Sequence, residues 1–209
     1  LCDAIAQYSF DPNFKANHSI QKPVIALLPG SRMSELKHVL PTMLEVCDEY
    51  PDYEFVLAGA AHIEDSVYLQ YIQGKNVRLI KGKTYDVVRN AHAALVCSGT
   101  ATLETALLNC PQVVCYRFSQ LSYEIGKRVI KVKFISLVNL IMDKKIVSEL
   151  IQGDFNKNAV KRELNQILDG AGRQTMLHSY AALKIVVGEP GASERAAKLI
   201  TERTFKLRV

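Results

Sequence analysis

Long hydrophobic runs are absent from the sequence. No stretch approaches the roughly 18 consecutive apolar residues that a membrane-spanning helix requires. Hydrophobic residues still make up 48% of the 209 residues, and charged residues make up 22%. These proportions are ordinary for a soluble protein and exclude disorder over the bulk of the chain. The sequence therefore predicts a globular protein of one α/β domain or one and a half.

A strong charge of one sign is also missing. The 26 basic and 21 acidic residues leave a net charge of +5. That excess is too small to indicate nucleic acid by itself, and no RNP, zinc-finger or helix-turn-helix signature accompanies it. We therefore expect no nucleic-acid partner. The mild positive charge fits a protein that holds an anionic ligand.

Metal-binding and redox motifs are missing as well. The spacing of cysteine and histidine residues matches no metal site, so we expect no metal and no cofactor. No CxxC pair occurs, and the scattered cysteines predict reduced, buried thiols in a reducing compartment such as the cytoplasm: Cys2, Cys47, Cys97, Cys110 and Cys115. There is no signal peptide and no initiator Met before Leu1, which predicts that the chain begins inside a longer protein.

Short apolar runs alternate with helical patterns over most of the chain. The runs predict strands at Val24–Leu28, Glu54–Ala58, Val77–Ile80, Ala93–Cys97 and Gln112–Tyr116, with a sixth at Phe134–Leu137. Helices are predicted between them, at Ser34–Tyr50, Ile63–Gln73, Tyr85–Asn90, Ala101–Leu108 and Leu121–Val132. This alternation predicts parallel βαβ units, and therefore an α/β fold with a Rossmann-like, doubly wound parallel sheet.

The pattern divides the chain into three parts. Residues 1–22 are mixed and polar, which predicts a linker from a preceding domain, with one helical turn near Leu1–Gln7. Residues 23–152 carry the alternation and form the predicted Rossmann-like domain. Residues 153–209 are predicted to form C-terminal helices that pack on it, at Asn158–Leu168, Arg173–Val187 and Ala192–Phe205.

The loop after the first predicted strand has an unusual composition, Pro29-Gly30-Ser31-Arg32. Gly30 lets the backbone approach a ligand closely, and the following helix presents free N–H groups that suit phosphate. Arg32 adds a planar cation that can grip a phosphate with two hydrogen bonds. Glu35, in the first turn, is expected mainly to complement the helix dipole. The alternative is an ordinary turn with one surface arginine.

The loop after the fourth predicted strand has the same character. Ser98, Gly99 and Thr100 leave the strand and open a helix, so their N–H and hydroxyl groups, with the hydroxyl of Thr102, can surround an oxyanion. Glu104 lies one turn further on, where a carboxylate can accept both hydroxyls of a ribose. The alternative is a threonine cap with Glu104 complementing the helix dipole. Together, the two loops predict a site for a nucleoside diphosphate at one edge of the sheet.

Several motifs, in order, resemble lipid-A-disaccharide synthases. The resemblance rests on these segments: Ile25–Arg32 with Ser34–Leu36 and Leu40-Pro41, Ala94–Glu104, Val113–Arg117, Ser136–Leu140, Glu149–Gln152 and Gly191–Ala197. It covers nearly the whole chain, and these motifs in order are far more specific than any one of them.

The resemblance implies one half of a GT-B fold, in which two Rossmann-like domains enclose the active site. The family transfers diacylglucosamine from its UDP donor to diacylglucosamine 1-phosphate (lipid X), forming the β(1→6) disaccharide of lipid A and releasing UDP, without a metal. This chain resembles the donor-binding half, so Gly30, Ser31, Arg32, Ser98, Gly99, Thr100 and Glu104 are expected to bind UDP. Arg32 is expected to stabilise the leaving diphosphate. The acceptor site and the catalytic base belong to the N-terminal domain, so the isolated chain is expected to bind donor without turnover.

Four further residues lie in the resembling motifs. Tyr116 and Arg117 follow a strand end and are expected to face the same cleft, although a core tyrosine and a surface arginine would give the same pattern. Asn139 and Gln152 are polar residues within apolar segments. They are expected either to contact phosphate or sugar, or to be buried amides satisfied by the backbone.

Membrane contact and self-association are two further expectations. Residues Tyr123 to Phe134 form a basic amphipathic stretch that suits an anionic membrane, and that equally suits an ordinary helix face on a sheet. Lipid substrates would place the protein peripherally at the inner membrane. Exchange of the last helix between protomers would give a homodimer. The competing hypotheses are another GT-B UDP-sugar enzyme, such as a peptidoglycan-type transferase or a UDP-sugar epimerase, and a non-catalytic nucleotide-binding module.

Overall fold

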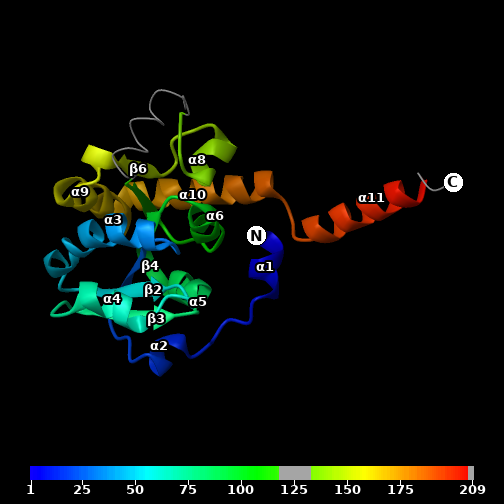
Figure 1. Ribbon diagram of the computed structural model, residues 1–209. Coiled ribbons are helices and arrows are strands. Elements are labelled where there is room, and N and C mark those ends of the chain that lie inside the picture. Colours follow the sequence, from blue (N-terminus) through cyan, green and yellow to red (C-terminus); the bar gives the residue numbers. More distant parts are fainter. Residues whose placement is uncertain (118–132, 207–209) are drawn as a thin grey trace.

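A six-stranded parallel sheet forms the centre of the computed structural model, which describes residues 1–117 and 133–206 (Figure 1). The strand order is β3-β2-β1-β4-β5-β6, and every neighbouring pair is parallel. This is the Rossmann order, so the predicted fold class is confirmed. The strands are β1 (Val24–Leu28), β2 (Glu54–Gly59), β3 (Val77–Lys81), β4 (Ala91–Cys97), β5 (Gln112–Tyr116) and β6 (Ser148–Ile151).

Helices cover both faces of the sheet, which explains why the central strand β1 is apolar at every position. All five residues of β1 are buried. Ile25 and Leu27 belong to the core shared with α3 (Met33–Leu44), α4 (Asp65–Ile72), α6 (Thr100–Leu107), α9 (Lys157–Leu168) and α10 (Gly170–Val187). Val24, Ala26 and Leu28 point the other way, into the core shared with α2 (Phe14–Asn17) and α5 (Thr84–Asn90).

The sixth strand is not where the sequence predicted it. Residues 137–142 form a helix, α8 (Leu137–Met142), and β6 comes later, at Ser148–Ile151. Ser136 is the N-cap of α8, and its hydroxyl accepts a hydrogen bond from the N–H of Asn139. The Glu149 carboxylate accepts the N–H groups of Ile135 and Ser136. These side-chain acceptors take the backbone donors that a strand would have offered to the sheet, so the segment turns into a helix.

The other helices predicted within the described residues form with shifted ends. α3 ends at Leu44 and contains Pro41, and a separate 3₁₀ turn, η1 (Cys47–Glu49), follows it. A second 3₁₀ turn, η2 (Gln152–Asp154), follows β6. The helix predicted at Leu121–Val132, and with it most of the basic stretch proposed for membrane contact, lies outside the described residues.

The N-terminal segment is anchored on the α5 side of the sheet. It begins with α1 (Cys2–Gln7), and from Phe14 onward it contributes to the core, since Phe14 is 1% exposed and Ile20 7%. Upstream of these residues, the Tyr8 hydroxyl donates a hydrogen bond to Asp86 at the start of α5. Whether residues 1–22 link this domain to another one stays a prediction.

The last helix is placed differently from the two helices before it. α9 and α10 cover the sheet, but α11 (Ala192–Lys206) extends away from the body, and its residues 192–201 are exposed (Figure 1). Gly188 and Gly191 have positive φ angles of 79° and 103°, which turn the chain between α10 and α11. The Asp3 carboxylate accepts hydrogen bonds from the N–H groups of Gly191 and Ser193, so α1 holds the start of α11.

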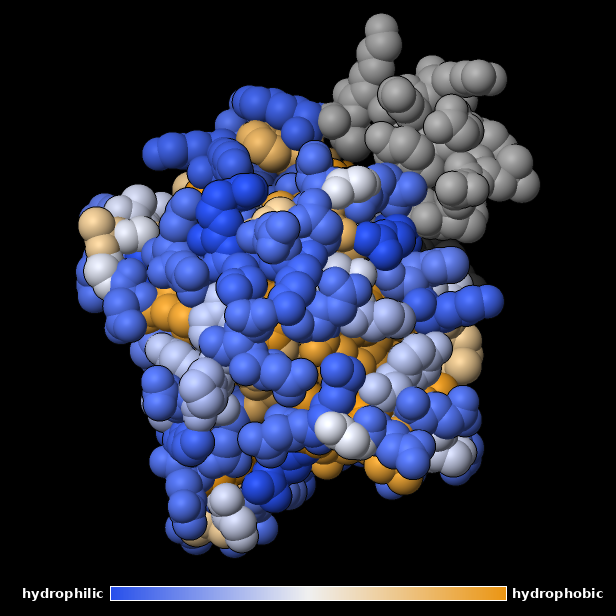
Figure 2. All heavy atoms as spheres, turned by 90° about the vertical axis from the view of Figure 1, so that its left-hand side faces the viewer, coloured by the Kyte–Doolittle hydropathy of each residue, from blue (hydrophilic) through white to orange (hydrophobic). Residues whose placement is uncertain are grey.

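The surface shown in Figure 2 is largely hydrophilic, with apolar side chains visible in gaps between the polar ones. This agrees with a core that lies on the two faces of the sheet. Within residues 1–117 and 133–206, no helix combines the length and the apolar character needed to cross a bilayer. The five cysteines are free thiols, of which Cys47, Cys97, Cys110 and Cys115 are buried.

Candidate nucleotide-diphosphate site

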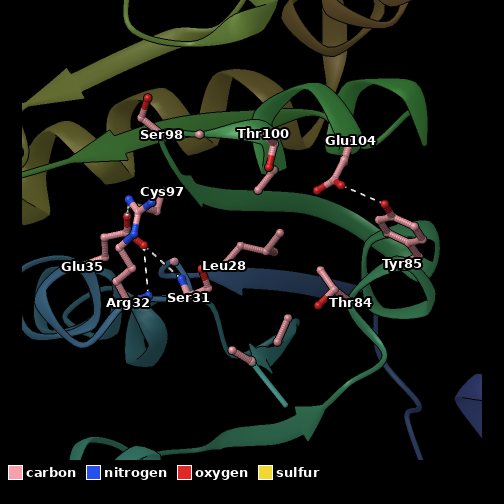
Figure 3. Close-up of a pocket in the computed structure, with 15 residues that line it drawn as sticks. Leu28, Ser31, Arg32, Glu35, Thr84, Tyr85, Cys97, Ser98, Thr100 and Glu104 are labelled. Carbon is pink, nitrogen blue, oxygen red and sulfur yellow. Dashed lines mark hydrogen bonds and ion pairs between the residues drawn. The ribbon is translucent and has the colours of Figure 1, made fainter. Parts of the chain in front are cut away.

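A cavity of about 560 Å³ lies at the carboxyl ends of β1 and β4, on the edge of the sheet where the strand order reverses (Figure 3). Ligands of doubly wound sheets bind at this position, because the connections from the two strands leave in opposite directions and open a crevice. All the residues expected to bind UDP line the cavity: Gly30, Ser31, Arg32, Ser98, Gly99, Thr100 and Glu104.

The loop after β1 gathers its N–H groups around an anion. The N–H groups of Ser31 and Arg32 donate to Oε2 of Glu35 over 3.0 and 3.2 Å. Nη1 of Arg32 donates to Oε1 of the same carboxylate over 3.2 Å. Gly30, with a φ of 103°, makes the turn that brings these groups together. Glu35 therefore caps α3, and the loop has the geometry to hold an oxyanion.

Arg32 is accessible to a ligand. Its side chain is 79% exposed although it pairs with Glu35, whose side chain is 14% exposed. An ion pair this exposed is weak, so the guanidinium can turn to a phosphate at little cost. His62 Nε2 lies 3.0 Å from the carbonyl oxygen of Ser31 and supports the loop from the β2 side.

The loop after β4 offers fewer free hydroxyls than the sequence suggested. The Ser98 hydroxyl donates to the carbonyl of Ile135 over 2.9 Å, and the Thr102 hydroxyl donates to the carbonyl of Gly99 over 2.8 Å. Thr102 is fully buried, whereas Gly99 and Thr100 are exposed at the N-terminus of α6. Thr100 and the backbone of this helix end are therefore the groups that remain for an anion.

Glu104 lies at the far end of the cavity from Arg32. Figure 3 shows Arg32 and Glu35 at one end, Tyr85 and Glu104 at the other, and Ser98 and Thr100 along the wall between them. Oε1 of Glu104 accepts a hydrogen bond of 2.8 Å from the Tyr85 hydroxyl. The cavity thus has a cationic end with clustered N–H groups and an opposite end with a carboxylate.

Thr84 and Tyr85 also line the cavity, and the sequence did not single them out as site residues. They open the helix that follows β3, whose carboxyl end lies at the same edge of the sheet as those of β1 and β4. The place of Thr84 and Tyr85 after a predicted strand could therefore have marked them as site residues in the sequence. Burial, with the Glu104 carboxylate beside it, raises the pKa of Tyr85 well above its usual value, so the phenol stays protonated as a donor.

Tyr116 and Arg117 are not among the residues that line the cavity. The Arg117 guanidinium donates to the carbonyl of Phe155 over 2.5 Å and to Oγ1 of Thr42 over 3.3 Å, and it lies over the Phe155 ring. It joins the end of β5 to α3 and to the segment after η2. Tyr116 is half-buried. Its pKa is raised mainly by burial, and to a smaller extent by the nearby Cys97 and Glu35.

Asn139 and Gln152 do not line the cavity either. Asn139 is fully buried, and its amide is used within the protein. Oδ1 accepts from the N–H groups of Ile146 and Val147, while Nδ2 donates to the Val147 carbonyl and to Glu149. For Asn139 the structure therefore favours a buried amide over a substrate contact. Gln152 opens η2 with a φ of 53°.

The cavity offers carboxylates and N–H groups rather than a metal-binding cluster. The part of the chain that the structure describes contains no group of three His, Cys, Asp or Glu side chains placed to hold a metal ion. Cys97 borders the cavity, but it is 3% exposed, and burial raises the pKa of its thiol to about 12. At neutral pH this thiol is therefore neither a nucleophile nor an anion.

The fold is that of one half of a GT-B-like structure. A solved S. aureus MnaA–UDP structure matches with a TM-score of 0.59 and 18% identity over 97% of this chain and 52% of that one. CalG4, the calicheamicin glycosyltransferase, matches with a TM-score of 0.60 and 13% identity over 90% of this chain and 44% of that one. At such low identities these likenesses establish the fold and not the activity.

Sequence comparison gives the family. The model of the lipid-A-disaccharide synthetase family matches residues 1–202. The lipid-A-disaccharide synthase of Myxococcus xanthus is 37% identical over 187 residues, which are 86% of this chain and 49% of that protein. The chain therefore belongs to the lipid-A-disaccharide synthase family of glycosyltransferases, and it spans about half the length of the relatives it matches.

Proposed function

We propose that this chain is the donor-binding half of a lipid-A-disaccharide synthase and that its cavity holds the UDP part of UDP-diacylglucosamine. The observation that carries the proposal is the convergence of seven expected ligand residues on one cavity at the switch point of the sheet. The S. aureus MnaA structure with the same fold was determined with UDP, which supports the choice of nucleotide.

The two ends of the cavity suit the two ends of UDP. The diphosphate would lie at the Ser31–Arg32 loop and the exposed N-terminus of α6, where N–H groups and a guanidinium meet. The ribose would lie at Glu104, whose carboxylate accepts hydroxyl hydrogens. Glu35 already occupies the N–H groups of the first loop, so a diphosphate would share or replace that carboxylate.

In the transfer reaction, this half would act on the leaving group. As the bond between the sugar C1 and the diphosphate breaks, negative charge grows on the phosphate oxygens. Arg32 and the preorganised N–H groups stabilise that charge more than they stabilise the bound donor, and so lower the barrier. The base that deprotonates the acceptor hydroxyl would come from the N-terminal half of the enzyme, with the site for diacylglucosamine 1-phosphate. The product is the β(1→6) disaccharide.

The acyl chains of both substrates favour a location at the cytoplasmic face of the inner membrane. The chain would act there as a peripheral protein, and its UDP site would be open to the aqueous side. The basic stretch between Tyr123 and Phe134 is our candidate for contact with anionic lipid, and co-sedimentation with anionic vesicles tests it. If Lys127→Glu with Lys131→Glu leaves vesicle binding unchanged, this contact is wrong.

Calorimetric titration with UDP, ADP and GDP tests the donor site. We expect selective UDP binding, weakened by Arg32→Ala and by Glu104→Gln by about 1 kcal/mol or more each, since each removes a charged hydrogen-bond partner. Arg162→Ala and Glu45→Gln are matched controls, because they make the same changes at exposed positions outside the cavity. They should leave the dissociation constant within twofold, as expected for surface substitutions.

Other outcomes would favour the competing hypotheses. Equal affinity for the three nucleotides would indicate a non-catalytic nucleotide-binding module. UDP binding that is insensitive to both substitutions would place the nucleotide elsewhere on the chain and contradict the roles of Arg32 and Glu104.

A further inference from the structure

The Glu104 carboxylate meets a single side-chain donor in the described part of the chain, the Tyr85 hydroxyl. That hydroxyl lies 2.8 Å from Oε1, and both residues line the cavity. Figure 3 shows the two side chains pointing at each other from α5 and α6. A carboxylate has about four acceptor positions, so one hydrogen bond from Tyr85 leaves room for two further hydroxyl donors.

Tyr85 is itself held in place by the N-terminal segment. The Tyr8 ring meets the Tyr85 ring edge to face, with centroids 5.1 Å apart and an interplanar angle of 73°. The Tyr8 hydroxyl donates to Oδ2 of Asp86 over 2.7 Å, and the N–H of Asp11 donates to Oδ1 over 2.9 Å. Asp86 is 2% exposed, so this anchor is buried.

From this geometry we infer that Tyr85 is a positioning and specificity-determining residue: its hydroxyl orients the Glu104 carboxylate for the 2′ and 3′ hydroxyls of a ribose, and the segment from Tyr8 to Asp11 holds Tyr85 in the orientation that does so. This inference rests on the proposed UDP site. It adds a recognition element contributed by α5 and by residues ahead of the first strand.

The physical reason is preorganisation. A glutamate side chain at the edge of a cavity loses rotational freedom when it binds two hydroxyls, and that loss weakens binding. A donor that already fixes one oxygen removes part of the loss before the ligand arrives. Because the pKa of Tyr85 is raised above its usual value, the hydroxyl stays protonated at neutral pH and remains a donor.

Tyr85 can be changed without disturbing the core. Val87 and Val88 provide the buried contacts of α5, and the Tyr85 ring is only partly buried. Tyr85→Phe therefore removes the hydroxyl and keeps the ring contact with Tyr8. Tyr53→Phe is a matched control, because Tyr53 is a partly buried tyrosine outside the cavity.

The experiment titrates this chain with UDP and with 2′,3′-dideoxy-UDP, which lacks both ribose hydroxyls. The measured quantity is the ratio of the two affinities. We expect the unsubstituted chain to prefer UDP and Glu104→Gln to abolish this preference. Tyr85→Phe should lower the preference about fivefold, the typical effect of one lost hydrogen bond. Tyr53→Phe should leave it unchanged. Affinity for the dideoxy nucleotide should not change in Tyr85→Phe. The double variant should match Glu104→Gln, because Tyr85 acts through Glu104.

Tyr8→Phe tests the second part of the inference. It keeps the ring and removes the hydrogen bond to Asp86, so the preference for UDP should fall, by less than in Tyr85→Phe. An unchanged preference in Tyr8→Phe contradicts the anchoring role of the N-terminal segment.

The outcomes separate this inference from the proposed function. If the unsubstituted chain prefers UDP through Glu104, but Tyr85→Phe weakens both nucleotides equally or leaves the ratio unchanged, the positioning role is wrong and the UDP site stands. If the unsubstituted chain fails to bind UDP or ignores the ribose hydroxyls, the proposed site is wrong and the role of Tyr85 with it.

Discussion

Asn139→Ala should destabilise the protein strongly while leaving the nucleotide site intact. The Asn139 amide satisfies two backbone N–H groups, those of Ile146 and Val147, one carbonyl and one carboxylate oxygen, over distances of 2.7 to 3.0 Å. Alanine leaves all four groups without this partner. Each buried group that loses its partner costs about 1–3 kcal/mol. Glu149 keeps its bonds to Ile135 and Ser136, which reduces the total.

We therefore expect a loss of about 3–5 kcal/mol in the free energy of unfolding, against about 0.5 kcal/mol for an exposed substitution. Urea denaturation followed by circular dichroism gives the loss, and UDP titration of the folded variant gives the affinity. Asn158→Ala, at an exposed position of α9, is the matched control. A loss below about 1 kcal/mol, or a normal stability with weakened UDP binding, would refute the assignment of Asn139 to the fold rather than the site.

Two further predictions concern the loop after β1 and the buried thiols. Gly30→Ala should weaken UDP binding and lower stability, because the φ of 103° disfavours alanine and the new Cβ would lie 2.8 Å from the Cβ of Glu35. Gly74→Ala is the control for backbone strain alone, since Gly74 has a φ of 74° and open space around it. Equal affinity for UDP in the two variants would contradict the loop's role. Burial raises the pKa of the Cys47, Cys97 and Cys110 thiols to about 12. Unfolded thiols ionise first, near pH 8.5, so stability is complete below that pH and falls as pH rises toward 12, by up to about 1.4 kcal/mol per pH unit for each thiol. Urea midpoints at pH 7.5 and pH 10 measure the fall, and equal midpoints would contradict it.

The two loops proposed to hold phosphate were predictable because their signal is local. A strand that ends in Gly30, or in Ser98-Gly99, must turn there, and the helix that follows must expose N–H groups. Once the alternation predicts a parallel sheet, both loops must lie at one edge. The structure places both loops in the wall of one cavity.

The remaining features depend on contacts that no local pattern reveals. The apolar run at Phe134–Leu137 resembled a strand, but Glu149, thirteen and fourteen residues later, takes the backbone donors of Ser136 and Ile135. The sequence left Asn139 either as a ligand contact or as a buried amide, and only its contacts in the fold show that it organises the turn that leads into β6. The position of Tyr85 after a strand end was a local signal, but its contact with Glu104, in another helix and nineteen residues further along the chain, was not.

One of the two edge strands of the described sheet, β3, bears on how the protein behaves at high concentration. β3 has a neighbour on one side within the described sheet, so its other edge presents backbone donors and acceptors that could recruit a strand from another molecule. Arg78 and Lys81 stand along this strand, paired with Glu54 and Asp65. Docking a second strand there would strip water from these charges. This unfavourable desolvation is the usual protection against edge-to-edge aggregation. Neutral substitutions at Arg78 and Lys81 would remove that protection, and neither residue lines the proposed nucleotide cavity.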